Sequence, residues 1–209
     1  MADNTLSEVE IKLYVTDLES VARKISNAGG ELIAPRVFEK NVRYENAEQT
    51  LSQRGIVVRL RQDSRARLTY KEPPAEVTDD GLSHRYEAEV DVSDFDTMEL
   101  ILSKLGYTPH LIYEKYRTTY QLGDVEIVLD EMPYGHFVEL EGVPDAIFAA
   151  LDTLGLSDAP RYKTNYVQLF QHIRRHLRLT FTDITFENFN GIDVPQRALD
   201  APDDNTNNG

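Results

Sequence analysis

Charged and apolar residues alternate in several short segments of this chain, beginning with Glu8, Glu10 and Lys12, which are separated by Val9 and Ile11. In an extended strand, successive side chains point to opposite faces, so the three charges share one side. Carboxylates are ligands for hard cations such as Mg²⁺ or Mn²⁺, whereas Lys and Arg bind phosphate oxygens. A half-buried surface strand also alternates, so the other strands must decide the interpretation.

The same alternation recurs along the chain, and cations and acids fall on the charged side of the expected strands. These positions are Arg43, Arg59, Arg61, Lys71, Arg85, Glu87, Glu89, Lys115, Arg117, Glu139 and Glu141. Several cations from different strands would hold a chain of phosphates rather than a single carboxylate. The carboxylate pairs Glu8 with Glu10 and Glu139 with Glu141 would supply oxygen ligands for a divalent ion that bridges protein and phosphate.

Periodicity predicts the elements that carry these residues. Period-two patterns indicate eight strands, at about 8–15, 38–44, 57–62, 67–71, 85–92, 112–122, 125–130 and 135–141. Helical spacing indicates helices at about 17–28, 94–106, 144–154 and 162–177, and glycines end the first two. The fold class is therefore α+β.

The apolar faces of these strands need a partner, and the amphipathic helices provide one. We therefore expect an eight-stranded antiparallel closed β-barrel whose lumen is charged and whose exterior is covered by helices, which also removes exposed sheet edges. The alternative is an open sheet backed by helices, with its charged face simply solvated.

Composition limits the remaining possibilities. The 209 residues are 41% hydrophobic, which suffices for a substantial core, and they include no cysteine, which excludes disulfides and thiolate metal sites. The five histidines form no zinc motif, although His172 and His176 are four residues apart. The net charge of −14 argues against a nucleic-acid-binding surface.

The chain shows no apolar run long enough for a membrane span and no secretory leader, so we expect a cytoplasmic protein without membrane contacts. Residues 1–198 are expected to form one domain. The polar composition of residues 199–209 predicts a disordered C-terminal tail. We expect a monomer or a homodimer.

The ordered series of charged motifs resembles the CYTH superfamily, the triphosphate tunnel metalloenzymes. The resemblance extends from about residue 6 to residue 170 and rests on Glu8-x-Glu10-x-Lys12, Arg59-x-Arg61, Lys71, Arg85-x-Glu87-x-Glu89, Lys115-x-Arg117 and Glu139-x-Glu141. It implies an eight-stranded antiparallel tunnel that binds a triphosphate. Members of the family act as class IV adenylyl cyclases, thiamine triphosphatases, inorganic tripolyphosphatases and RNA triphosphatases.

The resemblance also implies roles for individual residues. Glu8, Glu10, Glu139 and Glu141 resemble the metal-binding acids, and Glu87 and Glu89 resemble further tunnel acids that orient a second metal or water. Cations resemble the triphosphate clamp at Lys12, Arg59, Arg61, Lys71, Lys115 and Arg117, assisted by Arg43 and Arg85, and Lys163 resembles the lysine of the C-terminal plug helix. The sequence departs from the family pattern at residues 41–45, where many members carry a Tyr/Phe-rich stretch with Asp, and at residues 132–135, where a longer glycine turn is common.

These features predict an enzyme that requires Mg²⁺ or Mn²⁺ and hydrolyses a triphosphate held in the tunnel. Glu8, Glu10, Lys12, Glu87 and Glu89 are its expected catalytic residues. Inorganic triphosphate, ATP and thiamine triphosphate are the candidate substrates. Two alternatives remain: a class IV adenylyl cyclase that converts ATP to cyclic AMP and pyrophosphate, and a binding module for polyphosphate or nucleotide without catalysis.

Overall fold

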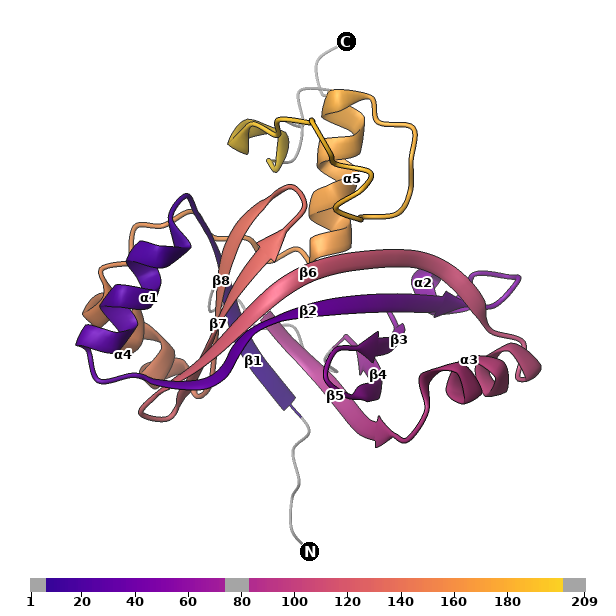
Figure 1. Ribbon diagram of the computed structural model, residues 1–209, viewed down its shortest axis with the longest axis horizontal. Helices are drawn as coiled ribbons and strands as arrows, with labels where there is room; N and C mark the ends of the chain where they lie inside the picture. The colour runs from indigo at the N-terminus through magenta and orange to yellow at the C-terminus, as the bar shows by residue number, and fades with distance from the viewer. Residues whose placement is uncertain (1–6, 74–82, 201–209) are drawn as a thin grey trace, which may run out of the picture.

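A computed structural model describes residues 7–73 and 83–200, with side chains from residue 9 to 73 and from 85 to 200 (Figure 1). The predicted α+β class is confirmed. The strands are β1 (Ser7–Val15), β2 (Glu31–Glu45), β3 (Val57–Gln62), β4 (Ala66–Glu72), β5 (Ser83–Val92), β6 (Thr108–Leu122), β7 (Val125–Met132) and β8 (Gly135–Glu141). The helices are α1 (Leu18–Asn27), α2 (Thr50–Gln53), α3 (Phe95–Lys104), α4 (Pro144–Leu154), α5 (Tyr166–Leu177) and the 3₁₀ turn η1 (Gln196–Ala198).

All neighbouring strands are antiparallel, in the order β1-β5-β4-β3-β2-β6-β7-β8, and β8 pairs in turn with β1. At β1, residues Ser7–Glu10 pair with β5, whereas Glu10–Val15 pair with β8. The two sets of pairs share only Glu10. Every strand therefore has a partner on both sides, but β1 pairs with β5 over one part of its length and with β8 over the other. The predicted closed barrel is thus supported only in part.

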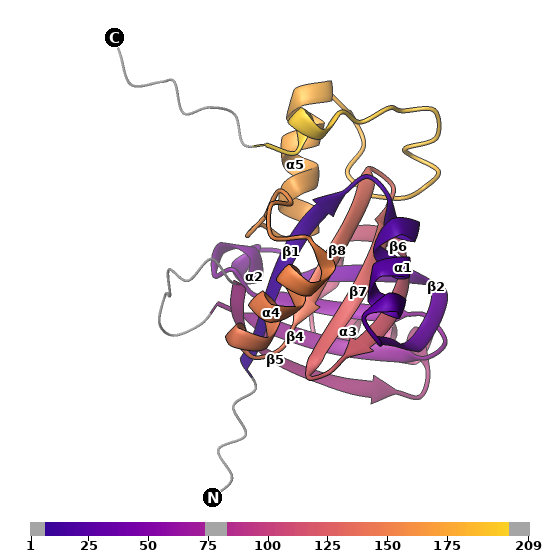
Figure 2. The same cartoon turned by 90° about the vertical axis from the view of Figure 1, so that its left-hand side faces the viewer.

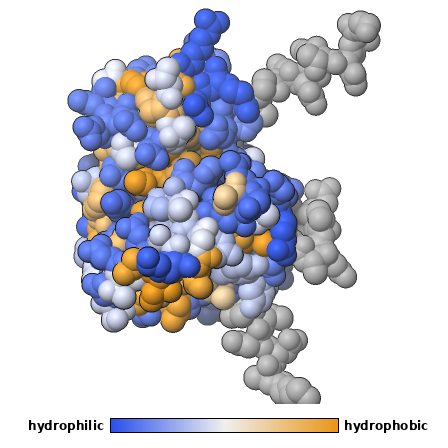
Figure 3. Space-filling view, turned by 90° about the vertical axis from the view of Figure 1, so that its right-hand side faces the viewer, coloured by the Kyte–Doolittle hydropathy of each residue, from blue (hydrophilic) through white to orange (hydrophobic). Residues whose placement is uncertain are grey.

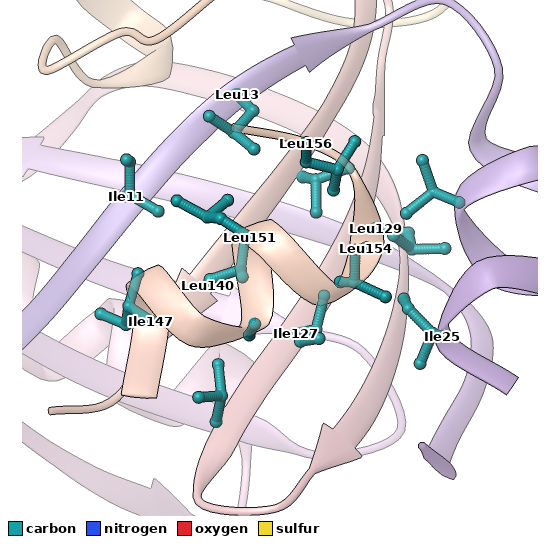
Figure 4. Packing of buried hydrophobic residues seen from close by; sticks show 14 residues of the cluster. Ile11, Leu13, Ile25, Ile127, Leu129, Leu140, Ile147, Leu151, Leu154 and Leu156 are labelled. Carbon is teal, nitrogen blue, oxygen red and sulfur yellow. The ribbon is translucent and has the colours of Figure 1, made fainter. Parts of the chain in front are cut away.

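Two helices cover the outer face of β1, β7 and β8 (Figure 2). Ile11, Ile127 and Leu140 from the three strands form one buried cluster with Ile25 of α1 and Leu151 of α4 (Figure 4). Burying such a side chain is worth about 1.5–3 kcal/mol. This packing leaves the opposite, charged side of the same strands facing inward.

Local sequence explains where these helices begin. Asp17 caps α1 by accepting a hydrogen bond from the Ser20 N–H at 2.9 Å, and Asp94 caps α3 by accepting one from the Thr97 N–H at 2.8 Å. A capping box between Asn165 and Gln168 starts α5. The α3 helix contributes Leu102 to a smaller apolar cluster with side chains of β2 and β3.

Helix α5 stands over one end of the strands, together with the segment that follows it (Figure 1). It buries Phe170 in a cluster that also includes Phe137 of β8 and Ile184. Ile184 pairs with β6: its N–H donates to the Ile112 carbonyl at 2.8 Å, and its carbonyl accepts from the Glu114 N–H at 2.9 Å. The segment thus covers part of the β6 edge that β7 does not reach.

Several bounds differ from the expectation. The strands β2 and β6 both have 15 residues, longer than predicted, because they pair with each other through two bulged ends. Residues 45–52, to which the sequence pattern assigned no element, include the start of α2. Its N-terminal backbone donors at Leu51 and Ser52 bond to the Glu45 carboxylate. Leu199 was assigned to the tail, but it is buried in the α5 cluster; residues 201–209 lie outside the described part.

Within the described residues, no helix is long and apolar enough to cross a membrane. The face shown in Figure 3 is mostly hydrophilic, with apolar patches between the polar groups.

Candidate functional site

The inward faces of the strands line a cavity of about 560 Å³. The cavity receives charged side chains from strands that are far apart in sequence, as the alternation predicted. Of the predicted site residues, those that line it are Glu10, Lys12, Arg43, Arg59, Arg61, Lys71, Arg85, Glu87, Glu89, Lys115, Arg117, Glu139 and Glu141.

Lys12 and Glu139 face each other across β1 and β8. The Lys12 Nζ lies 3.1 Å from Glu139 Oε1 and 4.5 Å from the centre of the Tyr166 ring. Burial acts to lower the pKa of Lys12, but the carboxylates of Glu139 and Glu10 outweigh it and raise that pKa. Lys12 is thus a buried ammonium at the wall of the cavity, and the neighbouring carboxylates favour its charged form.

Asp130 of β7 organises the cations next to this pair. Its carboxylate is fully buried and accepts hydrogen bonds from Lys115 Nζ at 2.9 Å, from Arg117 at 2.6 and 2.7 Å and from the Tyr166 hydroxyl at 2.8 Å. Burial acts to raise the pKa of Asp130, but Arg117 and Lys115 outweigh it and hold that pKa well below its usual value. Arg117 also donates to Glu139 Oε2 at 2.8 Å.

Glu39 of β2 is a second buried acid among these cations. Its Oε1 lies 3.5 Å from Arg61 NH1, and its Oε2 lies 3.7 Å from Lys115 Nζ. Burial acts to raise the pKa of Glu39, but Lys115, Arg117 and Arg61 outweigh it and lower that pKa. Asp130 and Glu39 therefore fix the positions of three cations from the protein side.

Glu89 of β5 ties the arginines of β3 and β4 together. It accepts from Arg61 NH2 at 3.1 Å and from Thr69 Oγ1 at 2.7 Å, and lies 3.6 Å from Arg59 NH2. Burial opposes the shift, but Arg61 and then Thr69 lower the pKa of Glu89. Arg59 also donates to the Tyr113 hydroxyl at 3.1 Å.

Three arginines of β3 and β4 have backbone-side donors of the guanidinium group, Nε–H, without an acceptor in the described structure. The Nε–H groups of Arg59, Arg61 and Arg67 are buried and make no hydrogen bond within the part of the chain that the structure describes. Buried donors are normally satisfied, so an acceptor such as a water or an anion is expected beside them. Lys71 pairs with Glu87 at 2.5 Å.

Carboxylates gather where β1, β8 and β7 run side by side. Glu141 is paired across the strands with Glu10 on one side and with Glu126 on the other, and all three line the cavity. Like charges directly opposite one another are unfavourable, so this row has the chemistry of a site for a cation. Within residues 7–73 and 83–200, no group of three or more His, Asp or Glu is already gathered around one metal position.

Two predicted site residues are not brought to the cavity by the described structure. Lys163 precedes α5, is exposed and is not among the cavity residues, whereas Asn165 and Tyr166 after it are. Glu8 lies in β1 opposite Arg85, but its side chain is outside the described part. The roles assigned to both residues stay predictions.

A family model described as the CYTH domain matches residues 6–152 of this chain. The chain belongs to the CYTH family. This result confirms the resemblance inferred from the charged motifs.

Known proteins similar to the chain come from several organisms. MJ0240 from Methanocaldococcus jannaschii, named as a proposed adenylate cyclase, is 29% identical over 137 residues, which cover 64% of this chain and 75% of that protein. A structure from Vibrio parahaemolyticus, also described as a proposed adenylate cyclase, has a TM-score of 0.68 and 22% identity over 78% of this chain and 97% of that one.

HpAC1 from Hippeastrum is described as a proposed adenylyl cyclase with a dominant triphosphatase activity. It has a TM-score of 0.58 and 18% identity, covering 78% of this chain and 95% of its own. At these identities the two solved structures show a shared fold, and they leave the choice of reaction open.

Some residues at the CYTH cavity were not predicted. Glu39 and Asp130 follow the same period-two pattern as the predicted residues on their strands, so the alternation could have identified them. Tyr113 lies two residues before Lys115 on β6, so the same alternation could have identified it as well. Tyr166 gave no such signal, because its place beside Asp130 depends on how α5 packs over the strands.

Proposed function

We propose that this CYTH protein binds a triphosphate in the cavity and hydrolyses it with the help of Mg²⁺ or Mn²⁺. The observation that carries the proposal is the convergence of Lys and Arg side chains from β1, β2, β3, β4, β5 and β6 on one cavity. A protein with a net charge of −14 has little reason to gather cations inside itself unless the ligand is a polyanion.

The cations are held ready for phosphate oxygens. Lys12, Lys115, Arg117 and Arg61 are fixed by the buried acids around them, so little side-chain ordering is required when a ligand binds. The remaining buried Nε–H donors of the arginines suit a ligand with many acceptor oxygens. Positioning and charge stabilisation of this kind supply most of the catalysis in phosphoryl transfer.

The donor set fits a divalent cation. Glu10 and Glu141, neighbours across β1 and β8, would hold it. Glu139, next to them, contacts Lys12 and Arg117. When bound, such an ion neutralises phosphate charge and activates water. The chain's own cations would then hold the phosphates in line, and Glu87 and Glu89, which line the same cavity, would orient the attacking water.

Adenylate cyclization is the second candidate, because the relative MJ0240 is named as a proposed adenylate cyclase. In that reaction the ribose 3′-hydroxyl attacks the α-phosphorus, and pyrophosphate leaves. The nucleoside would have to be held so that the two atoms lie about 3–3.5 Å apart. The polyphosphate clamp is the same in both reactions, so the orientation of the substrate decides between them.

Product analysis separates the candidates. The purified protein is incubated with Mg²⁺ or Mn²⁺ and either inorganic triphosphate, thiamine triphosphate or ATP, and the products are resolved by chromatography. Release of orthophosphate from inorganic triphosphate supports hydrolysis. Cyclic AMP and pyrophosphate from ATP, with inorganic triphosphate intact, would select the cyclase, and binding without turnover would select the non-catalytic module.

A further inference from the structure

Arg43 differs from the other cations of the cavity in its partners. It lies on β2 directly across from Arg59 of β3, at a separation that is about 5 Å for paired residues. Arg59, Arg61 and Lys12 each lie within 4.0 Å of a carboxylate oxygen. Within residues 7–73 and 83–200, by contrast, no hydrogen bond or ion pair forms to Arg43.

Two neighbouring arginines add positive charge around Arg43. Burial lowers the pKa of Arg43, and Arg85 and Arg59 lower it further, whereas Tyr113 and Glu45 act in the opposite direction without outweighing them. Glu45 lies two residues further along the same side of the strand. Its carboxylate accepts hydrogen bonds from the backbone N–H groups of Asn46, Leu51 and Ser52. An arginine in this environment is stabilised by an anion that comes from outside the protein.

Asn41 reinforces this imbalance. It lies two residues before Arg43 on the same face of β2, opposite Arg61, and is completely buried. Its side-chain nitrogen and oxygen both lack a hydrogen-bond partner within the described residues. Because Asn41 is neutral, it supplies no countercharge to Arg43. These residues belong to the stretch 41–45, in which the sequence departs from the usual family pattern.

We infer that Arg43 and Arg85, with Arg59 shared between them and the triphosphate clamp, form a subsite for a fourth phosphoryl group, so that the protein prefers linear chains of at least four phosphates. The inference rests on the proposed function, since the first three phosphates occupy the clamp of paired cations. An arginine fork can donate to two oxygens of one phosphoryl group, and two or three such forks can share its charge. The fourth group could belong to inorganic tetraphosphate or to a nucleoside tetraphosphate, which offer the same chemistry here.

Binding without metal tests the subsite while avoiding hydrolysis. Thermal unfolding of the wild type, Arg43→Gln and Arg43→Lys is followed in EDTA with increasing inorganic triphosphate, inorganic tetraphosphate or adenosine tetraphosphate, and dissociation constants follow from the shifts. Arg23→Gln, which removes an exposed arginine of α1, is the matched control. The melting temperature of each variant without ligand shows whether it is folded.

The wild type is expected to bind tetraphosphate at least about tenfold more tightly than triphosphate. Arg43→Gln should weaken tetraphosphate binding by at least about tenfold and triphosphate binding by a smaller factor, so that the preference is lost, whereas Arg43→Lys should keep part of it. If the wild type shows no preference for tetraphosphate, or if Arg43→Gln keeps that preference, the inference is overturned. The proposed function still stands in that case, provided that triphosphate binds. If neither inorganic chain binds, the proposed function itself fails. Equal preference for both tetraphosphates shows that the nucleoside is not required.

Discussion

Replacing Asp130 by Asn tests whether a buried acid holds the cations of the cavity in place. The substitution keeps the size of the side chain and one carbonyl oxygen but removes the negative charge. Asp130 is completely buried and accepts hydrogen bonds from Lys115, Arg117 and Tyr166, so in the variant two cations lose their shared counterion.

The magnitude follows from the degree of burial. Removing one partner of a buried ion pair costs about 3–5 kcal/mol, since the other charge remains desolvated. Glu139 still contacts Arg117, and Glu39 lies near Lys115, so these acids compensate in part. We therefore expect Asp130→Asn to lower the free energy of unfolding by about 3 kcal/mol, which shifts the melting temperature by about 10 °C for a chain of this size.

Urea denaturation at pH 7, followed by circular dichroism, measures this change. The control is Asp91→Asn on β5, which removes the same charge from an ion pair with Arg65 at 3.1 Å, where Asp91 has 62% side-chain exposure. An exposed pair contributes about 0–1 kcal/mol, so the control should scarcely change. Equal, small effects of the two substitutions would refute the view that Asp130 is a structural anchor of the cation cluster.

Two further perturbations address the metal and the titration of the buried acids. Glu10→Gln should preserve the fold and raise the Mg²⁺ concentration needed for half-maximal activity by more than about tenfold, as measured by titrating activity with Mg²⁺. Unchanged activity of this variant in EDTA would contradict the role of Glu10 as a metal ligand. Arg117 and Lys115 outweigh burial and lower the pKa of Asp130, so its stabilising effect is complete above its unfolded pKa of about 3.9 and decreases as the pH falls further. The stability difference between wild type and Asp130→Asn should therefore be constant from pH 7 to about pH 5 and narrow at lower pH, whereas a constant difference down to pH 2 would argue against that shift.

The sequence predicted the faces of the strands well, because period-two alternation is a local property. Most of the charges expected on one side of these strands line the cavity, as do Arg59 and Arg61 of β3. Family motifs reinforced the same residues. Lengths were less accurate: the ends of β2 and β6 beyond the expected bounds are held by pairing with each other, which is not a local signal.

Tertiary contacts account for what was not predicted. No periodicity indicates that Tyr166 of α5 reaches Asp130, or that Ile184 pairs with β6, because both depend on the packing of the C-terminal segment. Likewise, periodicity does not distinguish Arg43 from Lys115, since both are cations on the charged side of a strand. Only the structure shows that Lys115 has buried acids beside it and that none pairs with Arg43 within the described part of the chain.

Isothermal titration calorimetry with inorganic triphosphate tests most directly whether the cavity is a triphosphate site. The wild type should bind one molecule per chain, and Arg59→Gln should weaken binding by at least about tenfold, since hydrogen bonds to charged groups are worth about 1.5–3 kcal/mol. Arg23→Gln, on the exposed surface of α1, should bind as the wild type does. Absence of saturable binding to the wild type, or equal binding by Arg59→Gln, would contradict the assignment of the cavity to a triphosphate.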